Sequence, residues 1–235
     1  MKIILNFIII LYIFLFYDIP VFAEIFTTVP NQFVDVLNQK IRIHQVGYGQ
    51  TVLLIHGLPG CIEDWETIMP KLSKRFHVIA YDRPGHGLSS ANDLKYNLDH
   101  NVNIASALIH KLKLNNPIIV GHSYGGSIVL AMAVRNTPNI KAFISVSPIT
   151  STERKPNLLF KILKIPLIGP TLRFFMKLCG QNIIKKGMNI AFDPNQKNMP
   201  NDFIEKRCMI ISLPNNIVTA AREEMAICQD LLNLT

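Results

Sequence analysis

Short apolar runs alternate with amphipathic stretches along most of this chain of 235 residues. The runs are rich in Val, Ile and Leu and end at Gly, Pro, Asn or Asp, which is typical of strands bounded by turns. They predict strands near 33–37, 41–46, 52–56, 77–81, 117–121 and 141–147. The stretches between them predict helices near 63–74, 98–113, 124–135 and 215–232. This alternation favours an α/β fold with a mostly parallel sheet, whose parallel strands we expect to be buried on both faces.

The first 23 residues follow a different pattern. Lys2 precedes an apolar run from Ile3 to Tyr17, and small or branched residues lead up to Ala23. A positive start, an apolar stretch and a small residue before the cut are typical of a secretory signal peptide, so we expect cleavage after Ala23 and export to the periplasm or the medium. The alternative is an uncleaved N-terminal membrane anchor.

Composition narrows the class of protein. An apolar content of 49% excludes a disordered chain. The four cysteines, Cys61, Cys179, Cys208 and Cys228, lack the Cys-x-x-Cys spacing of zinc or redox sites, so we expect no metal. An exported chain permits disulfides, and the sequence leaves the pairing open, although a buried free thiol is expected for Cys61.

The net charge of +8 is local. Residues 151–211 hold eleven Lys and Arg against four Asp and Glu, interleaved with short apolar segments and prolines. This pattern predicts either a solvated helical face or contact with an anionic membrane surface. The chain has no recognisable nucleic-acid module, so we expect no nucleic-acid partner.

The strongest chemical signal is the pentapeptide Gly121-His122-Ser123-Tyr124-Gly125, between an apolar strand and a helix of small residues. By itself a Gly-x-Ser-x-Gly sequence is often a flexible turn. Between a strand and a helix it predicts a nucleophile elbow, in which a sharp turn exposes Ser123. The neighbouring positions must then be small, and Gly121 and Gly125 satisfy that requirement.

Two upstream segments fit the same site. The run from Val52 to Gly60 ends in His-Gly-Leu-Pro-Gly, and the run from Val78 to Ser89 contains Asp-Arg-Pro-Gly-His-Gly. We expect Gly57 and His122 to support the loops, and Asp82 and Arg83 to form local hydrogen bonds rather than to take part in catalysis.

These three segments together resemble the α/β-hydrolase superfamily, in its serine branch with a His-Gly-x-Pro-Gly loop and a Gly-His-Ser-x-Gly-Gly elbow. The resemblance implies an α/β-hydrolase core with a mostly parallel sheet, and Ser123 as the nucleophile. The oxyanion donors would be the backbone N–H groups of Leu58 and Tyr124. Related epoxide hydrolases and haloalkane dehalogenases place an aspartate where this chain has Ser123, whereas cofactor-free haloperoxidases keep the serine.

The same resemblance implies a domain plan and a reaction. Residues 1–23 would form the leader, 24–150 the core, 151–211 a helical cap, and 212–235 a core helix that precedes a missing C-terminal part. The reaction would be hydrolysis of an ester or related small acyl compound without a cofactor. The Leu and Phe content of the cap suggests a medium-length acyl or aromatic ester.

The chain departs from the family downstream of the elbow. A complete triad places its acid and its histidine after the nucleophile, yet no histidine follows His122. The sequence therefore leaves two hypotheses. Either this is a serine hydrolase lacking its last strands and triad partners, weakly active or inactive as it stands, or it is a non-catalytic remnant or binding module that retains the front half of the fold.

Overall fold

A computed structural model describes residues 30–92, 96–153, 185 and 202–234. Six strands of this part form one sheet in the order β1-β2-β4-β3-β5-β6. The strands are β1 (Gln32–Val36), β2 (Gln39–Val46), β3 (Thr51–Ile55), β4 (His77–Tyr81), β5 (Ile118–His122) and β6 (Ala142–Val146). The pairs β1/β2 and β2/β4 are antiparallel, and the other three pairs are parallel. The expected mostly parallel α/β fold is confirmed.

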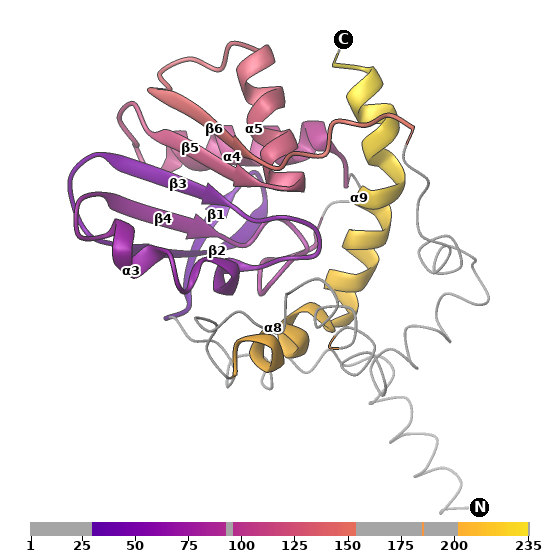
Figure 1. Cartoon of the computed structure of the whole chain (residues 1–235), viewed down its shortest axis with the longest axis horizontal. Helices are drawn as coiled ribbons and strands as arrows, with labels where there is room; N and C mark the ends of the chain where they lie inside the picture. Colours follow the sequence, from indigo (N-terminus) through magenta and orange to yellow (C-terminus); the bar gives the residue numbers. More distant parts are fainter. Residues whose placement is uncertain (1–29, 93–95, 154–184, 186–201, 235) are drawn as a thin grey trace, which may run out of the picture.

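The helices connect and cover these strands (Figure 1). They are the 3-10 helix η1 (Ile62–Trp65) and the α-helices α3 (Met69–Leu72), α4 (Leu98–Lys111), α5 (Tyr124–Val134), α8 (Phe203–Ile211) and α9 (Pro214–Leu232). The prediction of one helix over 63–74 is wrong, because the structure divides this stretch into η1 and α3. Pro70 lies in the first turn of α3, where its missing N–H costs no helical hydrogen bond, whereas in the middle of a longer helix it would break one.

The core lies on both faces of the sheet, and alternate strand residues divide between them. Leu53 and Ile79 pack with α4 and α5 on one face, and Leu54 and Val78 pack with η1 and Met69 of α3 on the other. Each of these four strand side chains is at most 1% exposed. Burial of one such side chain contributes about 1.5–3 kcal/mol, so these residues anchor β3 and β4 in the core.

The expectation of burial on both faces is wrong for β5 and β6. Ile144 and Val146 of β6 are 46% and 44% exposed, and the paired β5 residues Val120 and His122 are half-buried and exposed. The opposite face of β6 is covered, since the Ser145 hydroxyl donates to the Gly126 carbonyl of α5. Within the described ranges, no helix covers the face that carries Ile144 and Val146.

Helix α9 runs past the end of β4 and packs beside α4 (Figure 1). The carboxylate of Asp230 in α9 accepts the N–H of Leu98 at 2.8 Å, at the start of α4. Helix α8 falls at the end of the predicted cap, and its Arg207 forms an ion pair with Asp64 at 2.7 Å. These contacts join the last described segment to the loops that follow β3 and β4.

Several predictions concern residues outside the described ranges. The leader at 1–23 and most of the cap at 151–211 belong to this group, as does Cys179. In the part of the chain that the structure describes, no helix is both long enough and apolar enough to cross a membrane. Cys61 is a buried free thiol, which confirms the expectation for this residue.

Candidate active site

Ser123 lies at the turn between β5 and α5 in a backbone conformation that few residues adopt. Its φ is 54° and its ψ is −118°, outside the regions that an L-residue occupies without strain. The flanking glycines allow the turn, because a Cβ at Gly121 would lie 2.1 Å from the Gly125 carbonyl oxygen. A Cβ at Gly125 would lie 2.2 Å from the Ile55 carbonyl oxygen at the end of β3. The tight strand-to-helix turn predicted from the sequence is therefore present.

The loop after β3 lies directly against this turn. A Cβ built on Gly57 would lie 3.1 Å from the Cβ of Ser123, so the two backbones approach closely. Ser123 is half-buried, and its hydroxyl has no hydrogen-bond partner among the described residues. The N–H groups of Leu58 and Tyr124 likewise donate to no acceptor within those ranges. The structure thus brings Ser123, Gly57, Leu58 and Tyr124 to one place.

His56 braces the loop after β3. Its Nε2 accepts the Arg83 N–H at 2.9 Å, so its Nδ1 carries the proton and donates to the Gly57 carbonyl at 2.9 Å. Burial, reinforced by the positive charge of Arg83, lowers the pKa of His56 well below its usual value. His56 is therefore neutral at physiological pH and has no nitrogen left to take a proton from Ser123.

A first buried charge network fixes the loop after β4. Asp82 accepts the N–H groups of Ile62 at 2.7 Å and Leu88 at 2.9 Å, and it also accepts a guanidinium N–H of Arg42 at 3.2 Å. Arg42 in turn donates to both carboxylate oxygens of Glu63. Burial raises the pKa of Asp82 to about 6 although Arg42 opposes the rise, so the carboxylate is ionised at pH 7. The expected local role of Asp82 is confirmed.

A second buried network connects the same loop to α9. The Nη1 of Arg83 donates to Glu223 at 2.6 Å and to Asn101 at 3.1 Å, and its Nη2 donates to the Gly57 carbonyl at 2.9 Å. Burial opposes ionisation of Glu223, but Arg83 and His86 outweigh it and lower the pKa of this carboxyl to about 2. Arg83 therefore does more than form local bonds, since it joins segments 140 residues apart.

His86 belongs to this second network and forms no hydrogen bond with Ser123 among the described contacts. Its side chain is fully buried, and its Nε2 lies 2.8 Å from Glu223. Burial and the nearby Arg83 lower the pKa of His86, so the neutral ring donates a hydrogen bond from its Nε2–H to the ionised Glu223 carboxylate. The structure thus gives His86 a partner other than Ser123.

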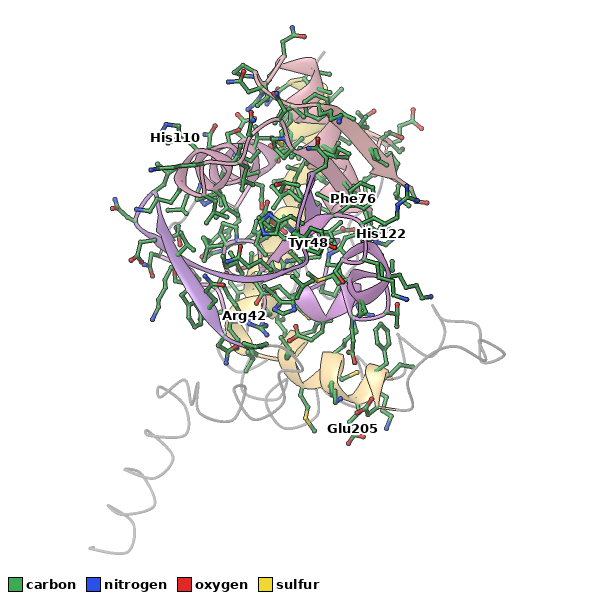
Figure 2. All side chains as sticks on the ribbon, turned by 90° about the vertical axis from the view of Figure 1, so that its left-hand side faces the viewer. Arg42, Tyr48, Phe76, His110, His122 and Glu205 are labelled. Atoms are coloured by element: carbon green, nitrogen blue, oxygen red, sulfur yellow. The ribbon has the colours of Figure 1, made fainter. Side chains whose placement is uncertain are left out.

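All seven histidines lie in the described part of the chain, at 44, 56, 77, 86, 100, 110 and 122. None of them forms a hydrogen bond with the Ser123 hydroxyl among the described contacts. His110 points outward from α4, and His122, which precedes Ser123 in the chain, is exposed (Figure 2). The ring of His122 forms no hydrogen bond within the described ranges, but its Nδ1 lies near Gly57, and its support of the loop stays a prediction.

Sequence reasoning missed Glu223, Arg42 and Glu63. A buried Glu in an amphipathic helix has the same local pattern as a solvated one, and its partner lies far away in the sequence. A weak signal was available, because Arg83 sits at the end of a buried strand and a buried guanidinium requires an acidic partner. In the described ranges, no group of three or more His, Cys, Asp or Glu side chains is arranged to hold a metal ion.

Comparison with known proteins agrees with this geometry. A family model for the alpha/beta hydrolase fold matches residues 50–163. The 2-hydroxymuconate semialdehyde hydrolase of Pseudomonas sp. (strain CF600) is 34% identical over 109 residues, which are 45% of this chain and 38% of that protein. The (E)-2-((N-methylformamido)methylene)succinate hydrolase of Acinetobacter baylyi is 34% identical over 104 residues, covering 44% and 40%. The matches thus span about two fifths of the length of these relatives.

Solved structures show the same fold. The enol-lactonase of Burkholderia xenovorans superimposes with a TM-score of 0.66 at 16% identity, over 83% of this chain and 74% of that one. Cfl2 of Burkholderia cenocepacia gives 0.70 at 16% identity, over 86% and 72%. The family model, the hydrolase relatives and the shared fold lead to one conclusion: the chain has the α/β-hydrolase fold, and residues 50–163 match the model of that family.

Proposed function

We propose that this chain carries the nucleophilic half of a serine hydrolase for esters or related small acyl compounds. Ser123 is the nucleophile, and the N–H groups of Leu58 and Tyr124 are the oxyanion donors. The observation that supports this proposal is the strained turn at Ser123 (φ 54°, ψ −118°) beside a loop and a helix start whose N–H groups have no acceptor within the described ranges.

The chemistry follows the usual course of acyl transfer. The Ser123 oxygen forms a bond to the acyl carbon while its proton passes to a base, and the carbonyl oxygen becomes an anion that the two N–H groups stabilise. The leaving alkoxide departs with a proton. Water then attacks the acyl-serine, releases the carboxylic acid and restores the hydroxyl.

The scheme requires a base that accepts the proton of Ser123, and the described histidines do not provide one. No histidine contacts the Ser123 hydroxyl among the described residues, and His56 and His86 are engaged elsewhere. We therefore propose that these residues form an incomplete triad and that turnover by the chain alone is slow or negligible. Loss of a triad histidine leaves the part of catalysis that binding and oxyanion stabilisation supply.

Addition of imidazole provides the test, because a small base in solution can replace a missing one. We expect a fluorophosphonate probe to label the chain slowly, and imidazole to accelerate the labelling and the hydrolysis of p-nitrophenyl butyrate. Ser123→Ala should abolish both reactions. His110→Gln, at an exposed histidine of α4, is the control, and this variant should be labelled like the unmodified chain.

The outcomes separate the two candidate functions. Labelling that depends on Ser123 supports the hydrolase. If the folded chain shows no reaction at Ser123 at any imidazole concentration, the hydrolase proposal fails and a non-catalytic remnant or binding module is favoured. The observation behind that alternative is the same lack of a histidine at the Ser123 hydroxyl. Fast hydrolysis without imidazole would contradict the incomplete triad.

The substrate and the location are proposals of a broader kind. The relatives are named as hydrolases of small organic compounds, so we propose a small acyl substrate, with a medium-length acyl or aromatic ester as the first to assay.

We also propose export directed by residues 1–23. Sequencing of the mature N-terminus should begin at Glu24, whereas an intact Met1 in a membrane fraction would indicate an anchor, and basic residues at 151–211 could then contact the same surface.

A further inference from the structure

Two donors hold the carbonyl oxygen of Gly57, in the loop after β3. The Nδ1–H of His56 and the Nη2–H of Arg83 each lie 2.9 Å from it. The side chains of both donors are fully buried. A carbonyl that accepts two hydrogen bonds from buried groups, one of them charged, cannot rotate without leaving both donors unpaired. The orientation of this one peptide group is therefore strongly determined.

The same peptide group contains the N–H of Leu58. In a trans peptide the C=O and N–H bonds share a plane and point in nearly opposite directions, and the Gly57–Leu58 bond is trans. When the carbonyl is held toward Arg83, the Leu58 N–H must point the other way, and it has no acceptor among the described residues. The two hydrogen bonds to the Gly57 carbonyl, which we call the Gly57 clamp, thus set the direction of the Leu58 N–H.

We propose that Arg83 and Glu223 are positioning residues that set the direction of the Leu58 N–H. The inference rests on the proposed function in so far as that N–H stabilises an oxyanion. Neither side chain touches the reacting atoms. Their effect passes through the Gly57–Leu58 peptide.

Glu223 is included because it determines where the guanidinium of Arg83 lies. The Nη1 donates to Glu223 at 2.6 Å and to Asn101 at 3.1 Å, which leaves Nη2 aimed at Gly57. Asn101 also donates to Glu223 at 2.8 Å and so fixes the carboxylate. The guanidinium lies 4.6 Å from the centre of the Tyr124 ring, in the residue that carries the second proposed donor. Helix α9 therefore supports both sides of the proposed oxyanion hole.

His56 does not replace this support. The orientation of its ring depends on the backbone N–H of Arg83, which its Nε2 accepts. A shift of residue 83 therefore affects both donors to the Gly57 carbonyl. The arrangement in which one guanidinium donates to Glu223, Asn101 and Gly57 is also specific to arginine, since the single ammonium group of a lysine cannot reach from Glu223 to Gly57. Arg83 is thus the common element of the clamp.

The test compares two variants with a matched control on the same helix. Glu223→Gln removes the charge that orients Arg83. Arg83→Lys keeps a positive charge but loses the two guanidinium nitrogens that donate to Glu223 and Gly57. The control is Asp230→Asn in α9, because Asp230 accepts the Leu98 N–H at 2.8 Å and does not contact Arg83. The measurements are the ¹⁵N–¹H NMR signals of the Leu58 and Leu98 amides, and the rate of fluorophosphonate labelling in imidazole.

We expect Glu223→Gln and Arg83→Lys to move the Leu58 signal, to leave the Leu98 signal in place, and to slow labelling about tenfold or more, given what an oxyanion donor contributes. Asp230→Asn should move only the Leu98 signal and leave the labelling rate within about twofold, since it does not touch the donor. A merely structural role would lower stability without this reciprocal pattern.

The result that overturns the inference is a folded Arg83→Lys or Glu223→Gln chain whose Leu58 signal is unmoved. If Glu223→Gln does not fold, Arg83→Lys decides. Failure of the proposed function looks different, because the unmodified chain would then not be labelled in imidazole while the two amide signals would still report on the clamp.

Discussion

Strain in the backbone is concentrated at Ser123. A residue with a Cβ in this conformation costs about 1–3 kcal/mol relative to a relaxed one, and it persists only where the surrounding structure requires it. Here the requirement is the close approach of α5 to the ends of β3 and β5, which the glycines at 121 and 125 permit. The residue that would do the chemistry is thus held in place by its neighbours.

The strain can be measured with two variants that both lack the hydroxyl. Ser123→Gly should be more stable than Ser123→Ala by about 1 kcal/mol, because glycine adopts positive φ freely and this gain exceeds its larger entropy loss on folding. Urea unfolding of the two variants provides the comparison. Equal free energies of unfolding would show that the turn is not strained.

The glycines of the elbow differ in how much they tolerate. Gly125→Ala should destabilise the fold by at least about 3 kcal/mol, because the new methyl group would meet backbone carbonyls that cannot move aside. Gly126→Ala should cost only about 1 kcal/mol, since its nearest neighbour, at 2.8 Å, is the Ser145 hydroxyl, which can rotate. Urea unfolding tests both, and equal losses would contradict the difference in packing.

At the scale of elements, the main connection is between α9 and the loop after β4. Glu223 neutralises Arg83 and accepts a hydrogen bond from His86, while Asn216 in the first turns of α9 donates to the Gly87 carbonyl at 3.2 Å. Thr219 fits against Gly85, where a Cβ would lie 2.3 Å from its Oγ1. Such buried polar contacts specify one arrangement, because any other leaves charges unpaired.

The contribution of Glu223 should depend on pH. Its pKa falls from 4.5 to about 2 on folding, so its stabilisation is complete above about pH 4.5 and is lost as the pH falls toward 2. At pH 7 the unmodified chain should be more stable than Glu223→Gln by about 3 kcal/mol. The difference should shrink when urea unfolding is repeated at pH 4 and pH 3. A difference that stays constant over this range would contradict the charge pair.

On the scale of the whole molecule, the strands of the sheet differ in how far their two faces are buried. Its centre is covered on both sides, whereas the face of β6 that carries Ile144 and Val146 has no helix over it within the described ranges. β6 also pairs with β5 alone among the described strands. Exposed apolar side chains on an unpaired edge strand favour self-association.

This exposure leads to a prediction about solubility. Ile144→Lys should reduce concentration-dependent self-association, because a charge on an edge strand opposes pairing with another copy. The free energy of unfolding should change by less than about 0.5 kcal/mol, since little burial is lost. Light scattering over a concentration series measures the first effect and urea unfolding the second. A large loss of stability would show that the side chain is packed after all.

The sequence predicted those features correctly that depend on the residues of a single short segment. The strand at 77–81 has the bounds that were expected, and the elbow at 121–125 was recognised because a strand, two glycines and a helix lie within a few residues of one another. It failed at 63–74, where Pro70 outweighs the helical pattern, and at β6, where burial depends on what packs above the strand. Glu223 was missed because nothing near it in the sequence identifies its partner.

The sequence by itself therefore determined the order of the strands, the tight turn at Ser123 and the α/β-hydrolase fold, since each of these depends on signals within short segments. Only the tertiary structure decided which charges are buried together, which histidines are already engaged, and how a glutamate in α9 reaches the Gly57 carbonyl through Arg83. The physical reason is that the energy of a buried charge depends on partners in space, which can lie more than a hundred residues apart along the chain.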